Sequence, residues 1–170
     1  MAAEGAVAET PLARLGPIAT ARLDLRRLRA ADAVALQAVT DDPAIAGAIS
    51  FLPLPFTLAD AAALIARAES GEDLFVGVWE NPGELAGVVG VHLRGGGEIE
   101  IGYWIGRRFQ GSGYAAEAAG AVIGQVRAAA PGRRIVAQCR PGNAASLRVL
   151  DRLGFVLTDS TAEWRRLVLR

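Results

Sequence analysis

The strongest chemical signal in the chain is a glycine-rich turn, Gln110-Gly111-Ser112-Gly113-Tyr114-Ala115. An alternating apolar run precedes it and a long apolar-rich run follows it, so we predict that it joins a strand to a helix. The first turn of a helix offers unpaired N–H groups and a partial positive charge, which together bind phosphate. Glycine lets the main chain approach an oxyanion closely, and Arg107 and Arg108 add positive charge just before the turn. A tight turn without a ligand is the alternative, and the turn alone does not decide between the two.

Two common nucleotide-binding motifs are excluded. A Walker A loop needs a Lys, and the sequence contains none. A dinucleotide-binding fold places its glycine turn after the first strand and an acidic residue about 20 residues further on. Here the turn follows the fourth expected strand, and the next strand, at 134–139, ends without an acid.

Composition places the chain among ordinary globular proteins. Its 170 residues fit one domain, with 52% hydrophobic and 21% charged residues. Acidic and basic residues balance at 18 each, so no net field favours nucleic acid or an anionic membrane as a partner. The sequence shows no apolar run of membrane-spanning length, and residues 1–10 lack the basic start of a secretory signal. The expected location is the cytoplasm.

The single cysteine and the single histidine limit the chemistry further. Cys139 alone cannot form an intrachain disulfide or a cysteine-based metal cluster, and its strand-like surroundings indicate a structural thiol. His92 alone supports neither a zinc site nor a Ser-His-Asp triad without help. We therefore expect no metal.

The elements that position the turn follow from periodicity and turn residues. Residues 1–20 are rich in Ala, Gly and Pro without a period, so we expect a loose extension followed by one domain at 21–170. Strands are expected at 21–28, 73–79, 84–94, 98–105 and 134–139, and a final pair of strands from 155 onward. Helices are expected at 30–39, 57–68, 114–129 and 143–153, and a further one begins at 43. This order predicts a single mixed α/β domain without repeats.

Three motifs in the right order resemble the GNAT superfamily of N-acetyltransferases. The turn at 110–115 matches that family's Gln/Arg-x-x-Gly-x-Gly/Ala acetyl-CoA motif. Residues 143–155 resemble its Asn-x-x-Ser/Ala…Gly-Phe helix, with the spacing of the ribosomal-protein alanine acetyltransferases, and 100–105 resemble that subgroup's strand. The resemblance runs from about Leu23 to the end of the chain.

The resemblance implies a single mixed, twisted and mostly antiparallel sheet flanked by helices, with strands four and five splayed apart to admit acetyl-CoA. It implies that the main chain of Ile105 pairs with the pantetheine arm and that N–H groups across the turn hold the pyrophosphate. Asn143 would lie near the thioester, although a helix N-cap explains it equally well and both roles can hold. The implied cofactor-binding residues are Ile105, Arg108, Gln110, Gly111, Ser112, Gly113, Tyr114, Ala115 and Asn143.

The implied reaction is attack of a primary amine on the thioester of acetyl-CoA, and two side chains are candidates to assist it. Glu100 precedes the cofactor turn on the same strand and is the candidate base, through a water, with Glu98 as its substitute; a solvated strand residue is the alternative. Many family members carry a Tyr that acts as the general acid at the position where this chain has Leu150. Ser146 takes that place as the candidate that protonates or hydrogen-bonds the departing sulfur, and a helix residue without a role is the alternative.

The acceptor amine stays open between a protein N-terminus and a small molecule. By analogy its pocket is formed by residues 51–56, the first helices and the final strands around Trp164, a mostly apolar lining. No nucleic acid or membrane is expected as a partner, and a homodimer is left open. A catalytically silent acyl-CoA-binding regulatory module is the second hypothesis, because the family's tyrosine is missing.

Overall fold

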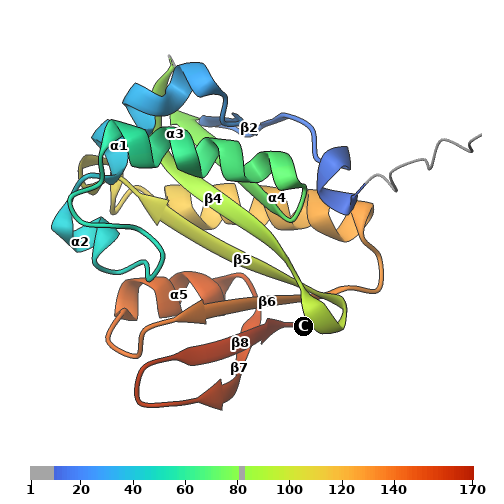
Figure 1. Cartoon of the computed structure of the whole chain (residues 1–170). Coiled ribbons are helices and arrows are strands. Elements are labelled where there is room, and N and C mark those ends of the chain that lie inside the picture. Colours follow the sequence, from blue (N-terminus) through green and yellow to red (C-terminus); the bar gives the residue numbers. More distant parts are fainter. Residues whose placement is uncertain (1–9, 81–82) are drawn as a thin grey trace, which may run out of the picture.

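The computed structural model describes residues 10–80 and 83–170, which form one mixed sheet with helices on both faces (Figure 1). Within these residues the sheet has eight strands in the order β1-β2-β3-β4-β5-β6-β8-β7. Only β5 and β6 pair in parallel; the other neighbours are antiparallel. The strands are β1 (Ile18–Ala19), β2 (Leu23–Arg27), β3 (Asp73–Glu80), β4 (Glu84–Arg94), β5 (Glu98–Ile105), β6 (Arg134–Cys139), β7 (Phe155–Ser160) and β8 (Arg165–Leu169). The predicted single α/β fold is confirmed.

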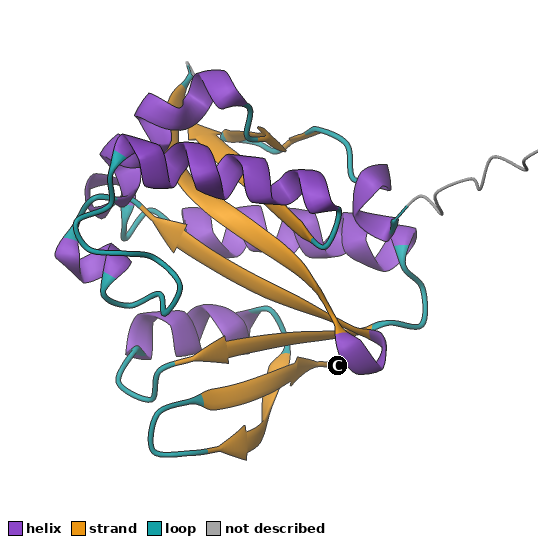
Figure 2. Cartoon of the chain, viewed as in Figure 1, coloured by secondary structure: helices purple, strands orange, loops and turns teal. Residues whose placement is uncertain are grey.

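Helices cover the two faces of the sheet separately (Figure 2). One face carries α1 (Ala33–Thr40), α2 (Pro43–Ala46) and α3 (Leu58–Arg67), and the other carries α4 (Tyr114–Ala129) and α5 (Ala144–Arg152). Each face has its own apolar core, and β5 contributes to both because its side chains alternate: Trp104 packs on the α1–α3 side, and Ile105 on the α4 side. No helix in the described ranges has the length and apolar character needed to cross a membrane.

Local sequence signals set several helix ends. Thr57 caps α3 and accepts a hydrogen bond from the Asp60 N–H, while the Asp60 carboxylate accepts one from the Thr57 N–H, and the two residues form a capping box. Helix α4 begins directly after Gly113, which adopts a left-handed conformation with φ of 83°. Helix α4 spans residues 114–129, as the sequence predicts.

Part of the expected loose extension is packed into the domain. A short 3-10 helix at Pro11–Arg14 precedes β1, which pairs with β2. Leu12 and Leu15 are buried in the core on the α4 side, and their carbonyls accept hydrogen bonds from Arg27. The folded domain thus begins before residue 21; residues 1–9 lie outside the described part of the chain.

The central feature of the sheet is the short pairing of β5 with β6. Their register holds at Glu98 with Arg134, Ile99 with Ile135 and Glu100 with Val136. Beyond Glu100 no further pairs form in the described chain, although β5 runs on to Ile105, and the two strands diverge (Figure 1). The predicted splay between the fourth and fifth long strands is therefore present.

The packing of the N-terminal segment yields a first prediction. Leu12→Ala removes a side chain that is 2% exposed, so we expect the free energy of unfolding to fall by about 2–5 kcal/mol. Leu58→Ala is the matched control, because Leu58 is 46% exposed and its loss is expected to change stability little. Urea denaturation of both variants measures the difference. Equal stabilities would show that residues 10–20 contribute nothing to the core.

Candidate active site

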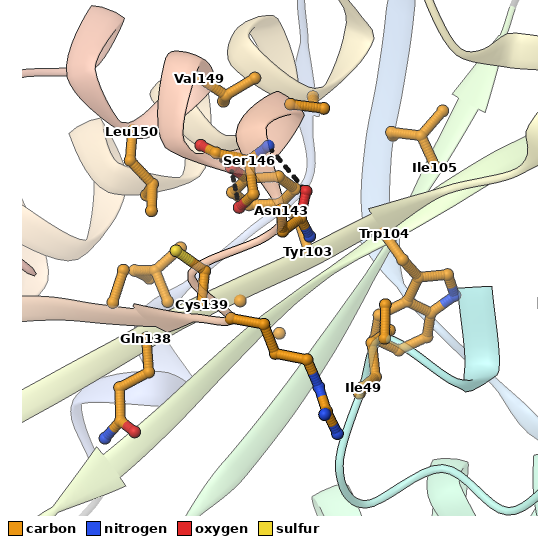
Figure 3. A pocket seen from close by; sticks show the side chains of 18 of the residues that line it. Ile49, Tyr103, Trp104, Ile105, Gln138, Cys139, Asn143, Ser146, Val149 and Leu150 are labelled. Carbon is orange, nitrogen blue, oxygen red and sulfur yellow. Dashed lines mark hydrogen bonds between the residues drawn. The ribbon is translucent and has the colours of Figure 1, made fainter. Parts of the chain in front are cut away.

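A cavity of about 980 Å³ passes through the gap between β5 and β6 and is lined from both faces of the sheet (Figure 3). Its lining on the α1–α3 side includes Gly90, His92, Glu100, Gly102 and Trp104, and on the α4–α5 side Tyr103, Ile105, Asn143, Ser146 and Leu150. Two molecules that enter from opposite faces can therefore meet within the gap.

The glycine-rich turn offers a row of free main-chain donors at one end of this cavity. Gly111 and Gly113 have φ of 82° and 83°, in the left-handed region where a side chain is strained. Within the described residues no hydrogen bond uses the main-chain N–H groups of residues 111–116. These groups surround the start of the 16-residue helix α4 and can bind a phosphate anion.

Two side chains hold the turn in place. Arg22, on the segment before β2, donates to the Ser112 carbonyl at 2.9 Å and pairs with Glu117 of α4 at 2.6 Å. Gln110 folds back and donates from Nε2 to the Ile105 carbonyl at 2.9 Å. Gln110 thus fixes the path of the chain from β5 into the turn. Arg22 was missed from sequence because it lies 90 residues from Ser112 and no local pattern links them.

Arg108 does not line the cavity, contrary to its prediction as a cofactor-binding residue. Arg107–Phe109 form a single 3-10 turn that buries Phe109, and this turns Arg108 outward. Arg108 pairs there with Glu84 at the start of β4. The Ser112 side chain is also outside the lining, whereas Arg148 and Arg152 of α5 contribute to it. The other predicted cofactor-binding residues all line the cavity.

Asn143, Ser146 and Tyr103 meet where α5 approaches β5 (Figure 3). The Asn143 side-chain oxygen accepts from the Ser146 N–H at 3.0 Å and so caps α5. The Tyr103 hydroxyl lies 3.0 Å from Ser146 Oγ and donates to the Ser146 carbonyl at 3.2 Å. Burial raises the pKa of Tyr103 to about 12, so this phenol stays protonated at neutral pH. The sequence does not reveal this contact, which joins residues 43 positions apart.

On the α1–α3 side, two glycines form the floor of a hollow. Gly90 of β4 lies directly opposite Gly102 of β5, and the next pair along that face is His92 opposite Glu100. A Cβ at Gly102 would meet nothing within 4 Å. The His92 ring lies over Gly90, so the open space is above Gly102, with His92 and Glu100 at one end and Trp104 at the other.

The two acidic candidates differ in what they contact. Glu100 lines the cavity and accepts a hydrogen bond from Arg94 Nε at 2.8 Å. Glu98 does not line the cavity; it binds Arg166 and Arg134, both at 2.7 Å. Glu98 therefore fastens the closed end of the gap, and it is no substitute for Glu100.

Cys139 is buried, as expected of a structural thiol, and its burial raises the pKa of the thiol. Among the described residues no group of three His, Cys, Asp or Glu side chains could hold a metal ion.

Structural comparison finds close neighbours among ribosomal-protein acetyltransferases. A ribosomal-protein alanine acetyltransferase from Vibrio fischeri superposes with a TM-score of 0.76 at 20% identity, over 89% of this chain and 94% of that one. RimL, a ribosomal α-N-protein acetyltransferase in complex with coenzyme A, gives a TM-score of 0.77 at 19% identity, over 90% and 98%. At this level of identity the shared property is the fold.

Sequence comparison extends the relationship to a family. The uncharacterized N-acetyltransferase YjdG of Bacillus subtilis is 35% identical over 69 residues, 41% of either chain. The chain spans about half the length of the curated relatives it matches. The family model described as the acetyltransferase (GNAT) domain matches residues 22–156, which include the turn, the splayed strands and α5. By this match over most of its length, the chain belongs to the GNAT acetyltransferase family.

Proposed function

We propose that the protein transfers the acetyl group of acetyl-CoA to a primary amine by direct attack of the amine on the thioester. One observation carries the proposal: a single cavity joins the free N–H groups of the turn to the hollow at Gly90 and Gly102 through the sheet. A cofactor held at the turn and an amine held in the hollow would meet in the gap. The coenzyme A bound to RimL supports the choice of cofactor.

Acetyl-CoA would be held mainly by main-chain groups. Its pyrophosphate fits the N–H groups of residues 111–116, and its pantetheine arm would pair with the main chain near Ile105. Arg148 and Arg152 replace Arg108 as cations within reach of the cavity. Acetyl-CoA supplies an activated acyl group with a thiolate as leaving group.

Ser146 and Tyr103 are proposed to stabilise the departing sulfur. A hydrogen bond from Ser146 Oγ would stabilise a thiolate at the gap, and the Tyr103 hydroxyl lies against that oxygen. Tyr103 thus supplies a phenol beside Ser146, although Leu150 occupies the position of the family's tyrosine. This contact weakens the case for a silent binding module, which rested on the missing tyrosine.

The acceptor would enter on the α1–α3 side. Phe51, on the loop before α3, lines the cavity and is 43% exposed, so an apolar group beside the amine would find a contact there. Both a protein N-terminus and a small-molecule amine meet this requirement. Glu100 remains a candidate base in this hollow, although Arg94 already occupies one of its oxygens.

Cofactor choice can be tested by thermal melting. Acetyl-CoA is expected to raise the melting temperature, because a ligand at 100 times its dissociation constant adds about 2.7 kcal/mol to the free energy of unfolding. NAD and ATP at the same concentration are expected to leave it unchanged. A shift with ATP and none with acetyl-CoA would refute the proposed cofactor.

The turn itself is tested by Gly113→Val. The side chain would be strained at positive φ and would obstruct the free N–H groups, so we expect at least a roughly tenfold weaker affinity for acetyl-CoA. Gly96→Val is the matched control, since Gly96 also has positive φ, at 71°, but lies outside the cavity lining. Isothermal titration of both folded variants gives the affinities. Equal acetyl-CoA affinities in the two variants would show that the turn is not part of the binding site.

The leaving-group side is tested with Ser146→Ala and Tyr103→Phe. Loss of one hydrogen bond to an ionised group costs about 1.5–3 kcal/mol, or roughly ten- to a hundredfold in kcat. Acetyl-CoA affinity should change far less. If the two hydroxyls act as one unit, the double variant will be little slower than the slower single variant. Full activity in Ser146→Ala would mean that the thiolate leaves unaided.

A further inference from the structure

His92 is the only histidine of the chain, and it is buried at the end wall of the hollow. Its ring extends over Gly90: a Cβ at Gly90 would lie 2.7 Å from His92 Nε2, closer than any real contact. Residue 90 must therefore lack a side chain for the ring to lie there. Both residues line the cavity, and in the described chain no hydrogen bond uses Nε2. The Nε2 edge of the ring is thus free at the hollow.

The other ring nitrogen is held by a carboxylate. His92 Nδ1 lies 2.5 Å from Asp73 Oδ1, and Asp73 Oδ2 pairs with Arg67 Nε at 2.7 Å. An ionised carboxylate can only accept hydrogen bonds, so Nδ1 must carry the proton. In the neutral ring Nε2 then has a free lone pair, directed at the hollow. Asp73 therefore fixes the tautomer.

The surroundings keep the ring in position and neutral. The Phe51 and Phe75 rings pack edge-on against it, with centroids 6.2 and 5.6 Å away. Four charged groups face His92: Asp73 from β3, Arg67 from α3, Arg94 from its own strand and Glu100 from β5. Burial lowers the pKa of His92 by more than Asp73 raises it, so the imidazole is unprotonated at neutral pH.

We propose that His92 Nε2 takes the proton from the acceptor amine during acetyl transfer, with Asp73 as its positioning residue. The amine nitrogen forms a bond to the acetyl carbon while the carbon–sulfur bond breaks, and the sulfur keeps the bonding electron pair. The proton lost by nitrogen moves to Nε2, and Asp73 stabilises the imidazolium until solvent removes the proton. The products are the acetylated amine and the thiolate of CoA, so atoms and charge balance. This inference rests on the proposed function.

His92 suits this step better than Glu100. An imidazole titrates closest to neutral pH, where a base is both unprotonated and strong enough to accept a proton. Glu100 lies opposite it, but one of its carboxylate oxygens already accepts a hydrogen bond from Arg94. Glu100 is then left to attract the positively charged form of the amine into the hollow.

Kinetics and magnetic resonance together test the proposal in the full chain made without a histidine tag. An acceptor is first selected by CoA thiol release from a panel of peptides, polyamines, amino acids and aminoglycosides. His92→Gln is expected to lower kcat by about 10²–10⁴-fold with little change in acetyl-CoA affinity. Because the chain has one histidine, its ring gives one set of NMR signals, whose titration reports the pKa of His92 directly.

The pH profile separates the two bases. In the wild type, kcat should rise with pH through the pKa measured by NMR. This rising part of the pH profile, the acidic limb, should be absent in His92→Gln and present in Glu100→Gln. Asp73→Asn removes a carboxylate that raises the pKa of His92, so the limb should move to lower pH and kcat should fall. Asp32→Asn is the matched control: Asp32 is also paired with an arginine, Arg26, at 2.8 Å but lies outside the lining, so the limb should stay in place.

Three results would overturn the inference in distinguishable ways. A limb that persists in His92→Gln and vanishes in Glu100→Gln would make Glu100 the base and leave acetyl transfer intact. A wild type that binds acetyl-CoA but acetylates no amine of the panel would reject the proposed function, and the role of His92 with it. A ring protonated at Nε2 rather than Nδ1 at neutral pH would also exclude it as the base.

Discussion

Glu98 of β5 binds Arg134 of β6 and Arg166 of β8, and these contacts fasten the closed end of the parallel β5–β6 pairing. Two residues further on, the strands stop pairing and diverge. Main-chain groups at such an edge need a partner, since unpaired buried N–H and C=O groups are costly. An extended ligand with amides of its own, such as a pantetheine arm, would satisfy them. Every other part of the proposed site is arranged around this opening.

The two faces of β5 divide the chemistry because successive side chains point to opposite sides. Tyr103 reaches the start of α5 on one face, where it contacts Ser146. Glu100 and Gly102 belong to the other face, opposite His92 and Gly90. The proposed hydrogen-bond donor for the sulfur and the proposed proton acceptor for the amine therefore lie on opposite faces of one strand.

Local patterns in the sequence were enough to predict the elements and the cofactor turn. Helix α4 and strand β6 begin and end as the periodicity indicates, and Thr57 and Asp60 form a local cap for α3. All of these depend on residues within a few positions of one another.

Contacts between distant segments could not be predicted in the same way. His92 meets Asp73 across a hairpin, and Arg22 meets the turn from 90 residues away. Nothing in either neighbourhood marks these partners, so the sequence indicates only a lone histidine at His92. Arg108 shows the converse: its position in the sequence suits a phosphate, but in the structure it pairs with Glu84 beside the buried Phe109. The direction of a side chain depends on which of its neighbours in the sequence is buried in the core.

The same arrangement that readies His92 also makes the folded state sensitive to acid. The pKa of His92 is lowered in the folded chain, chiefly by burial, so the unfolded chain binds its proton more readily. Its contribution to stability is therefore complete above pH 6.5 and is lost as pH falls below that value through the lower pKa of the folded chain. Burial alone would raise the pKa of Asp73, but His92 and Arg67 hold it below 3.8, so a second loss follows only at still lower pH. Mildly acidic solution thus acts first on the imidazole, before the Asp73 carboxylate is protonated.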